Sequence, residues 1–178
     1  MSENEKVKNI LAALKSYPDF PKQGILFWDI FSVLNTPSAA RDLVSLLESH
    51  IHEKCPQVDV FVGLESRGFL FGLPLSTSFF KPFIPIRKKG KLPGKTKEVS
   101  FKLEYGEDVF EIQAESIKPG QCVVILDDLL ATGGSLKAAN ELVSSMGGTV
   151  GLNLVCIELK DLQGRNNITS PVQSVLQL

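Results

Sequence analysis

Residues 123–135 read VVILDDLLATGGS, and this stretch decides the fold class. Its four apolar residues continue a run that begins at Cys122, which is typical of a strand covered on both faces of a sheet. The glycines then lead into SLKAANELVSSMGG, where apolar residues recur at helical spacing before Gly147-Gly148 ends the helix. We therefore expect a buried strand, a tight turn and a helix, with Asp127 and Asp128 at the carboxyl end of the strand.

Strands and helices alternate in the same way over most of the chain. VDVFVGL (58–64) and VGLNLVCIEL (150–159) predict two more buried strands. Further helices are expected at about residues 5–16, 38–54, where Ser38 is a candidate cap, and 68–79. This alternation predicts an α/β fold with a parallel sheet and short N- and C-terminal additions, in a single domain spanning 1–178.

The segment between residues 82 and 113 has a different character. FIPIR (83–87) predicts a short strand, which Pro82 and Pro85 place at an edge of the sheet or in an irregular position. KKGKLPGKTKEVS (88–100) is rich in lysine and glycine and predicts a long mobile loop. FKLEY and DVFEIQ then alternate like the two strands of a hairpin.

Composition excludes several classes of protein. Over 178 residues the net charge is −1, so no overall field favours nucleic acid or an anionic membrane. No apolar run approaches the roughly 20 residues of a membrane-spanning helix. Three widely spaced cysteines fit a reducing compartment better than a disulfide framework. We expect a cytoplasmic protein with no nucleic-acid or membrane partner.

The glycine-rich turn has the chemistry of a phosphate site. Thr132, Gly133, Gly134 and Ser135 offer hydroxyls and unobstructed backbone N–H groups at a helix N-terminus, where partial positive charge attracts a phosphate. Two carboxylates directly before it would repel that phosphate, but they can accept hydrogen bonds from sugar hydroxyls or organise Mg²⁺. The pattern lacks the GK[ST] of a Walker loop and the GxGxxG of a dinucleotide site. It therefore predicts a phosphorylated sugar as ligand.

VVILDDLLATGGS resembles the 5-phosphoribosyl 1-pyrophosphate (PRPP) motif of the type I phosphoribosyltransferases. PDFPKQGILFWDI (18–30), GLESRGFLFG (63–72), RKKGKLPG (87–94) and LEYG (103–106) look like segments of the adenine phosphoribosyltransferase family in particular. The resemblance implies a Rossmann-like, mainly parallel sheet flanked by helices, a small hood at about 18–34 and a flexible loop at about 88–103. It also implies transfer of the phosphoribosyl group of PRPP to adenine, which gives AMP and pyrophosphate.

The resemblance assigns roles to residues of this chain. It implies PRPP or AMP binding by Asp127, Asp128, Ala131, Thr132, Gly133, Gly134 and Ser135, and pyrophosphate binding by Ser66, Arg67, Arg87, Lys88 and Lys91. It implies base binding by Leu26, Phe27, Trp28 and Leu129, Glu104 as the catalytic acid/base, and Tyr105 as part of a closing loop. Mg²⁺ would be held mainly through PRPP, with no direct protein ligand, and the assembly would be a homodimer.

Three positions depart from the family pattern. Trp28 stands where a basic residue is common, Glu65 where Asp is more usual, and Ser135 where Thr is more usual. Trp28 leaves two alternatives to adenine transfer open: a 6-oxopurine phosphoribosyltransferase, and a PRPP-binding regulatory paralogue with weak or no turnover.

Overall fold

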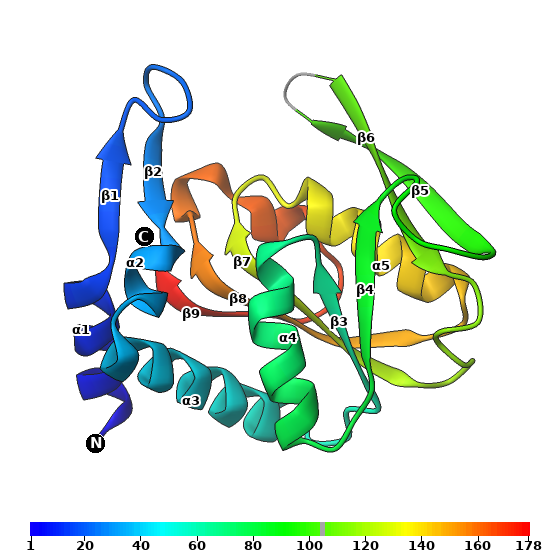
Figure 1. Cartoon of the computed structure of the whole chain (residues 1–178), viewed down its shortest axis with the longest axis horizontal. Coiled ribbons are helices and arrows are strands. Elements are labelled where there is room, and N and C mark those ends of the chain that lie inside the picture. The colour runs from blue at the N-terminus through cyan, green and yellow to red at the C-terminus, as the bar shows by residue number, and fades with distance from the viewer. Residues whose placement is uncertain (104–105) are drawn as a thin grey trace. The chain divides into compact units, whose positions relative to one another are not determined.

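The computed structural model describes residues 1–103 and 106–178, so Glu104 and Tyr105 lie outside the described residues. Contacts within the chain separate two compact units, Met1–Ser49 and His50–Leu178 (Figure 1). Helix α3 (Pro37–Lys54) begins in the first unit and ends in the second. The single domain expected over residues 1–178 stays a prediction.

The first unit combines helices with a small hairpin. Before α3 it contains α1 (Glu3–Ala13), β1 (Lys15–Pro18), β2 (Leu26–Asp29) and α2 (Ile30–Leu34). Helix α1 begins earlier than residue 5 because Ser2 and Glu5 form a capping box, in which each side chain bonds the backbone N–H of the other. Helix α3 begins at Pro37, so the prediction that Ser38 caps it is wrong. Proline suits the first helical position because the N–H it lacks would have no partner in the helix.

The hairpin of the first unit comprises strands β1 and β2, which pair antiparallel with Lys15 opposite Asp29 and Pro18 opposite Leu26. The Asp19 side chain closes the connection by accepting the Gly24 N–H at 2.7 Å. Asp29 then caps α2 by accepting the Phe31 N–H at 3.0 Å. Strand β2 and the connection fall within the segment expected to be the hood, at about 18–34, whereas β1 precedes that segment except for Pro18.

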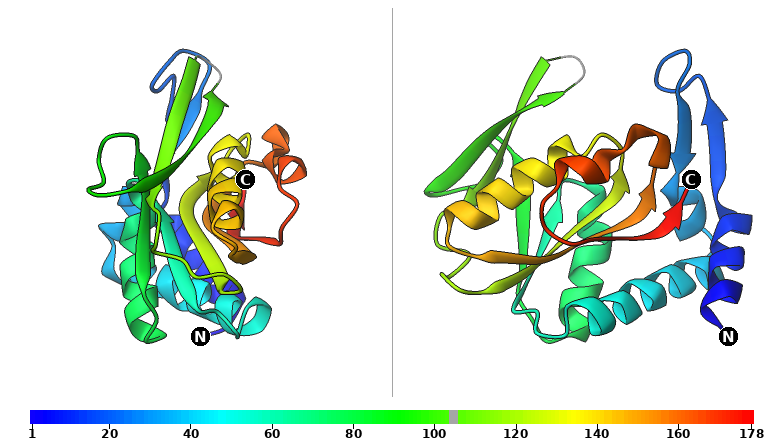
Figure 2. Two further views of the ribbon diagram at one scale, coloured as in Figure 1. Left: turned by 90° about the vertical axis from the view of Figure 1, so that its right-hand side faces the viewer. Right: turned by 180° about the vertical axis from the view of Figure 1, so that it is seen from behind.

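The second unit contains the main sheet and the helices that cover it. In chain order it holds the end of α3, β3 (Val60–Leu64), α4 (Arg67–Ser78), β4 (Phe83–Lys88), β5 (Thr96–Leu103), β6 (Gly106–Gln113), β7 (Cys122–Leu130), α5 (Gly134–Ser145), β8 (Thr149–Glu158), the 3₁₀ turns η1 (Lys160–Leu162) and η2 (Gly164–Asn167), and β9 (Val172–Gln177). The strand order is β5-β6-β4-β3-β7-β8-β9. Helices α4 and α5 lie on opposite faces of this sheet (Figure 2).

The central and C-terminal strands of this sheet run parallel. Strand β3 pairs in parallel with β4 and β7, β7 with β8, and β8 with β9, while β4–β6 and β5–β6 are antiparallel. The carboxyl ends of β3 and β7 therefore lie side by side at one edge. The predicted α/β class with a mainly parallel sheet is confirmed.

Three local features differ from the sequence-based expectations. Strand β4 is interior, between β3 and β6, although it meets β6 only at Arg87 and Lys88, so Pro85 needs no N–H partner on that side. Strand β5 begins at Thr96, inside the segment expected to be a loop. The C-terminal addition supplies β9, a parallel strand at the end of the sheet.

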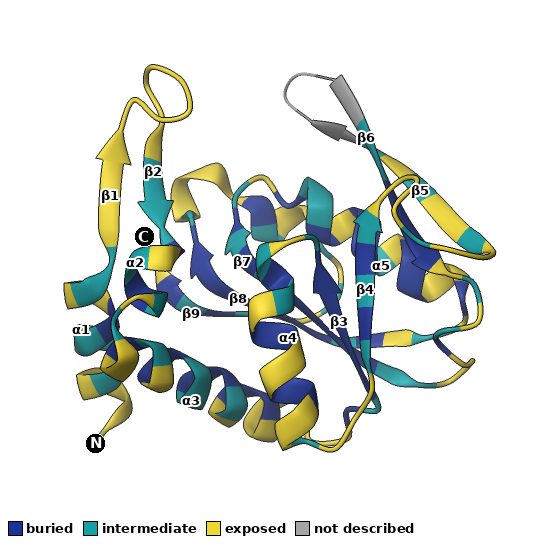
Figure 3. Ribbon diagram, in the orientation of Figure 1, coloured by how far each residue is buried: buried dark blue, intermediate teal, exposed yellow. Residues whose placement is uncertain are grey.

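One hydrophobic core cluster of the second unit joins strands of the sheet to α5, and the central strands are largely buried (Figure 3). Alternate residues of the central strands, such as Val60, Val62, Val123 and Ile125, are fully buried there. The buried residues of α5 in this cluster include Leu136, Ala139, Leu142 and Val143, and the C-cap residue Met146 is buried with them. Within the described part of the chain, no helix is both long and apolar enough to span a bilayer.

Candidate functional site

A polar cavity of about 480 Å³ opens at the carboxyl ends of β3 and β7. It is lined by Leu64, Glu65, Ser66, Arg67, Lys88, Phe110, Asp127, Asp128, Leu129, Leu130, Ala131, Thr132, Gly133, Gly134, Ser135 and Leu136, all from the second unit. Parallel sheets bind ligands at this edge because the strands end there and the helices that follow begin there. The cavity contains all seven residues expected to bind PRPP or AMP.

Strand β7 supplies two adjacent carboxylates to this cavity. The Asp127 carboxylate accepts the Asp128 N–H at 3.0 Å, and the Asp128 side chain is largely buried. Burial raises the pKa of Asp127 well above its usual range, and the neighbouring charge of Asp128 raises it further. Burial also raises the pKa of Asp128, although the Arg67 charge opposes that shift. Hydroxyl donors or a cation from a ligand would stabilise the two buried carboxylates in their charged form.

The loop after β7 turns directly into α5 and presents its backbone to the cavity. Gly133 has a φ of 85°, a left-handed conformation that suits glycine, and its carbonyl accepts the Lys137 N–H at 2.9 Å in the first turn of the helix. No side chain caps this helix N-terminus among the described residues. The first N–H groups of α5 are thus available to an anion, and the dipole of the helix favours one there.

A second helix N-terminus reaches the same cavity from β3. Ser66 and Arg67 begin α4, and the next residue, Gly68, packs so closely on β7 that a Cβ would collide with the Leu126 carbonyl oxygen. Arg67 Nε lies 2.5 Å from Asp128 Oδ2, in an ion pair that lacks the direction of a hydrogen bond. The Nε is buried, so this pair holds the guanidinium beside the carboxylates of β7.

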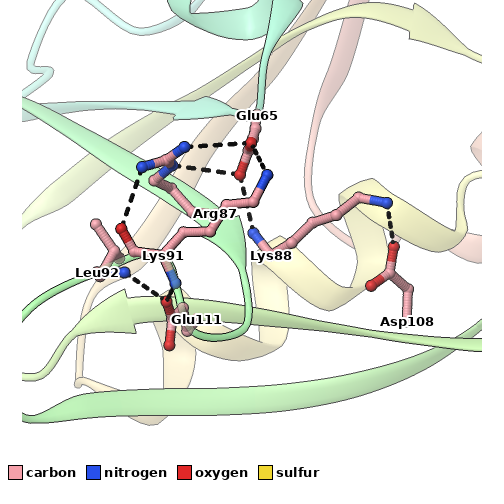
Figure 4. A network of polar contacts seen from close by, with 7 residues as sticks. All are labelled: Glu65, Arg87, Lys88, Lys91, Leu92, Asp108 and Glu111. Atoms are coloured by element: carbon pink, nitrogen blue, oxygen red, sulfur yellow. Dashed lines mark hydrogen bonds and ion pairs between the residues drawn. The ribbon is translucent and has the colours of Figure 1, made fainter.

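The basic segment Arg87–Lys91, which begins in β4, is already engaged by carboxylates (Figure 4). Glu65 accepts hydrogen bonds from Arg87 Nε and Nη2, each at 3.3 Å, from Lys91 Nζ at 2.6 Å and from the Lys88 N–H at 3.1 Å. Burial favours the neutral acid, but these donors outweigh it and lower the pKa of Glu65 to about 2. Glu111, which is buried, accepts the N–H groups of Lys91 and Leu92 at 2.7 Å each.

The cavity therefore includes only part of the expected pyrophosphate set. Ser66, Arg67 and Lys88 line it, whereas Arg87 and Lys91 do not. Lys88 Nζ also has a partner, the Asp108 carboxylate at 2.7 Å. Sequence reasoning missed the roles of Glu65, Asp108 and Glu111; the one available signal was a glutamate placed directly after a buried strand.

The expected base-binding residues belong to both units. Leu129 lines the cavity of the second unit. Within the first unit, Leu26 is exposed, Trp28 is half-buried, and Phe27 packs edge-on against Phe20 at 5.0 Å between ring centroids. A separate apolar hollow in that unit is lined by Tyr17, Pro18, Asp19, Phe20, Phe27, Asp29 and Phe31.

The described residues hold no group of three or more His, Cys, Asp or Glu side chains that could bind a metal. Asp127 and Asp128 nevertheless bring two carboxylates to the cavity. This donor set fits Mg²⁺ that arrives with phosphate ligands of its own and keeps most of its coordination to them and to water.

Comparisons with known proteins agree with this geometry. The family model of the phosphoribosyl transferase domain matches residues 31–176. The adenine phosphoribosyltransferase of Drosophila pseudoobscura is 50% identical over 177 residues, which cover 99% of this chain and 98% of the relative. A solved adenine phosphoribosyltransferase from Saccharomyces cerevisiae superposes with a TM-score of 0.94 at 40% identity, covering 97% of this chain and 99% of its own. That from Thermoanaerobacter pseudethanolicus gives 0.92 at 39% identity, with the same coverage. The chain belongs to the phosphoribosyl transferase domain family and, within it, to the adenine phosphoribosyltransferases.

Proposed function

We propose that this chain transfers the phosphoribosyl group of PRPP to adenine and releases AMP and pyrophosphate. One observation carries the proposal: a single cavity combines two adjacent carboxylates with a backbone cradle at a helix N-terminus. A ribose 5-phosphate has the complementary arrangement, with two hydroxyls at one end and a phosphate at the other. The yeast relative was solved in complex with an imino-altritol bisphosphate and adenine, which supports the same pair of ligands here.

The sugar is held at both ends in this proposal. Asp127 and Asp128 accept hydrogen bonds from its hydroxyls, and the loop Ala131–Ser135 holds its 5-phosphate. Anchoring both ends fixes the anomeric carbon for attack and so lowers the entropic part of the barrier. The same carboxylates stabilise positive charge that develops on the ring as the bond to pyrophosphate breaks.

The pyrophosphate leaves toward the second helix N-terminus. Ser66 and Arg67 begin that helix, and the guanidinium of Arg67 brings a positive charge to the cavity. Lys88 adds a cation on the wall of the cavity. Arg87 and Lys91 join this set only by leaving Glu65, so we place them second to Arg67 and Lys88.

Adenine is bound by the hood in this proposal. Phe27 packs against the adenine ring, while backbone groups of Leu26 and Trp28 recognise its amino edge and so distinguish it from a 6-oxopurine. A ring nitrogen attacks the anomeric carbon, the bond to pyrophosphate breaks, and the proton of that nitrogen passes to Glu104. Tyr105 helps to cover the site and exclude water.

Mg²⁺ accompanies PRPP and supplies charge neutralisation to the diphosphate when it is bound. The residues of the chain contribute the sugar contacts, the phosphate cradle and the exclusion of water. A test is the turnover rate in EDTA and after Mg²⁺ is restored.

We also propose a cytoplasmic homodimer. The free thiols Cys55, Cys122 and Cys156 suit a reducing compartment. The first unit exposes large apolar side chains, including Tyr17 at 47%, Phe20 at 53% and Phe31 at 52%, and a partner subunit would cover such a surface. Light scattering coupled to size-exclusion chromatography gives the mass of the assembly directly.

The deciding assay mixes the protein with PRPP, Mg²⁺ and labelled adenine, hypoxanthine or guanine. AMP formed from adenine alone supports the proposal. Product from a 6-oxopurine would indicate that alternative. Intact PRPP binding without product from any base would favour the regulatory paralogue.

The acid/base role of Glu104 has its own test. Glu104→Ala is expected to lower kcat by about 100-fold or more, the usual contribution of a positioned acid or base, while PRPP still binds. Equal turnover in the variant would remove Glu104 from the mechanism.

A further inference from the structure

The segment after β8 lies against the phosphate loop without entering the cavity. Strand β8 is followed by the 3₁₀ turns η1 and η2, whose sequence KDLQGRNN covers residues 160–167. Among the described residues that line the cavity, none comes from this segment. Two of its residues, Gly164 and Asn167, instead contact the phosphate loop directly.

Gly164 packs backbone to backbone against the loop. A Cβ at Gly164 would collide with the Ala131 carbonyl oxygen and would lie 2.9 Å from the Gly133 nitrogen. The contact is reciprocal, because a Cβ at Gly133 would collide with the Gly164 carbonyl oxygen. Both glycines are buried. The spacing between the two segments is thus fixed by the absence of side chains on both.

Asn167 sets the direction of one peptide unit in the loop. Its Nδ2 donates to the Thr132 carbonyl oxygen at 2.8 Å. In a planar trans peptide the carbonyl and the following N–H point in opposite directions. A donor that holds the Thr132 carbonyl therefore turns the Gly133 N–H away from Asn167. The loop N–H groups are the donors that a phosphate needs.

Arg165 fastens this segment to the sheet. Its Nε and Nη2 donate to the two oxygens of Glu158 at 3.0 and 2.6 Å, and its Nη1 donates to the Val172 carbonyl at 2.6 Å. Glu158 is buried and also accepts the Ser174 hydroxyl at 2.7 Å. A bidentate guanidinium–carboxylate pair fixes orientation as well as distance. The contacts of Gly164 and Asn167 are therefore held from β8 and β9.

We infer that Gly164 and Asn167 are positioning residues for the 5-phosphate: they fix the peptide planes of Ala131 to Gly133 so that the loop N–H groups meet the phosphate. The inference rests on the proposed function, because it concerns the phosphate of the same sugar. It predicts that weakening this support lowers affinity for the 5-phosphate end of the ligand and leaves the pyrophosphate end unaffected.

The test compares Asn167→Ala with Asn166→Ala. Asn166 is the exposed neighbour, and its side chain makes only a 3.4 Å contact with Gln163. Asn167→Ala is expected to raise the KM for PRPP and the inhibition constant of ribose 5-phosphate by about three- to tenfold, the effect of one hydrogen bond. The kcat, the KM for adenine and the inhibition constant of pyrophosphate should stay within about twofold, the level expected throughout for the Asn166→Ala control.

Gly164→Ala is expected to raise the inhibition constant of ribose 5-phosphate more than Asn167→Ala does, because the added Cβ must displace the phosphate loop. If Gly164→Ala does not fold, the constants of Asn167→Ala still test the inference. Unchanged constants for PRPP and ribose 5-phosphate in Asn167→Ala would overturn the inference. Equal losses for ribose 5-phosphate and pyrophosphate would do so as well, because they would indicate a general structural effect.

Calorimetric titration with ribose 5-phosphate separates this inference from the proposed function. If the wild-type chain binds it but makes no AMP, the proposed function fails, and the affinities of the two asparagine variants still test the positioning role. If the wild-type chain does not bind ribose 5-phosphate at all, both proposals are overturned.

Discussion

The phosphate loop Ala131–Ser135 and the basic segment Arg87–Lys91 are both candidates to bind anions, yet they differ in where their polarity comes from. The phosphate loop uses backbone N–H groups, and glycines keep side chains away from them. The basic segment uses full charges, but Arg87 and Lys91 share an ion pair with Glu65, and Lys88 is paired with Asp108.

This difference separates local from distant information in the sequence. A backbone cradle depends on a short run of residues, so a motif is enough to predict it. The availability of a cation depends on carboxylates supplied by other elements, here the end of β3 and strand β6. A lysine-rich run therefore gives a weaker prediction of an anion site than a glycine turn at a helix N-terminus does.

The largest effect is expected at the carboxylates beside the phosphate loop. Replacing Asp127 and Asp128 together by Asn should raise the KM for PRPP by about 100-fold or more, since a hydrogen bond to a charged group contributes about 1.5–3 kcal/mol. Steady-state kinetics at varied PRPP measures this. An unchanged KM would remove both residues from the sugar site.

The same double variant should be more stable than the wild type at pH 7.5. Both carboxyls have a raised pKa in the folded chain, so the fold binds their protons more tightly than the unfolded chain does. Their contribution to stability is present below the usual carboxyl pKa and is lost as the pH rises through the raised values. The neutral amides avoid that loss, and we expect Tm to rise by about 3 °C or more, the shift for ~1 kcal/mol.

The second effect concerns Glu65, the residue that pairs with Arg87 and Lys91 of the basic segment. The pKa of Glu65 is lowered to about 2, so its stabilisation is present above the usual carboxyl pKa and is lost as the pH falls toward 2. A shift of that size corresponds to about 2–3 kcal/mol. Glu65→Gln should therefore lower Tm at pH 7 by roughly 5–10 °C. Urea unfolding at pH 7 and pH 3 should show the difference narrowing at the lower pH, and equal stability at pH 7 would contradict the role.

The third effect concerns Lys88 and tests whether its ion pair with Asp108 limits its contribution to PRPP binding. Lys88→Met should raise the KM for PRPP by about fivefold and weaken its dependence on salt, as expected for one lost cation. Asp108→Asn should act in the opposite direction by about twofold, because it frees Lys88 for the ligand. If both variants raise the KM for PRPP, PRPP binding depends on the intact ion pair between Lys88 and Asp108 and not on a free Lys88.

The smallest effect is expected at Glu98, which pairs with Lys89 on the surface at 2.7 Å. Both side chains are well exposed, so solvent screens the pair. Glu98→Gln should change stability by less than about 0.5 kcal/mol and leave the KM for PRPP unaltered. It is the matched control for Glu65→Gln, since each change removes one carboxylate from a basic segment. If Glu98→Gln lowers stability as much as Glu65→Gln does, then the exposure of an ion pair does not determine how much that pair stabilises the fold.

Sequence reasoning predicted the fold class and the phosphate loop because both depend on local patterns. Apolar runs and helical spacing place β7, α5 and β8 without knowledge of their neighbours. The interior position of β4 was missed because Pro85 suggests an edge, whereas only the register shows that its missing N–H faces no strand.

The contacts around the site show the same limit. The pairing of Glu65 with Arg87, and of Gly164 with the phosphate loop, joins residues far apart in the sequence. No periodicity or motif reports such contacts. Glu104, the expected acid/base, lies outside the described residues, and its role stays a prediction.

The contact between Gly133 and Gly164 also has a consequence for how this protein can change during evolution. Each glycine would collide with backbone atoms of the other segment if it gained a side chain, so a larger residue at one position cannot be compensated by a smaller one at the other. We therefore expect both positions to remain glycine. Laboratory evolution toward other sugar phosphates should find its accepted changes around Asp127 to Leu129, which line the cavity without such a contact between two backbones.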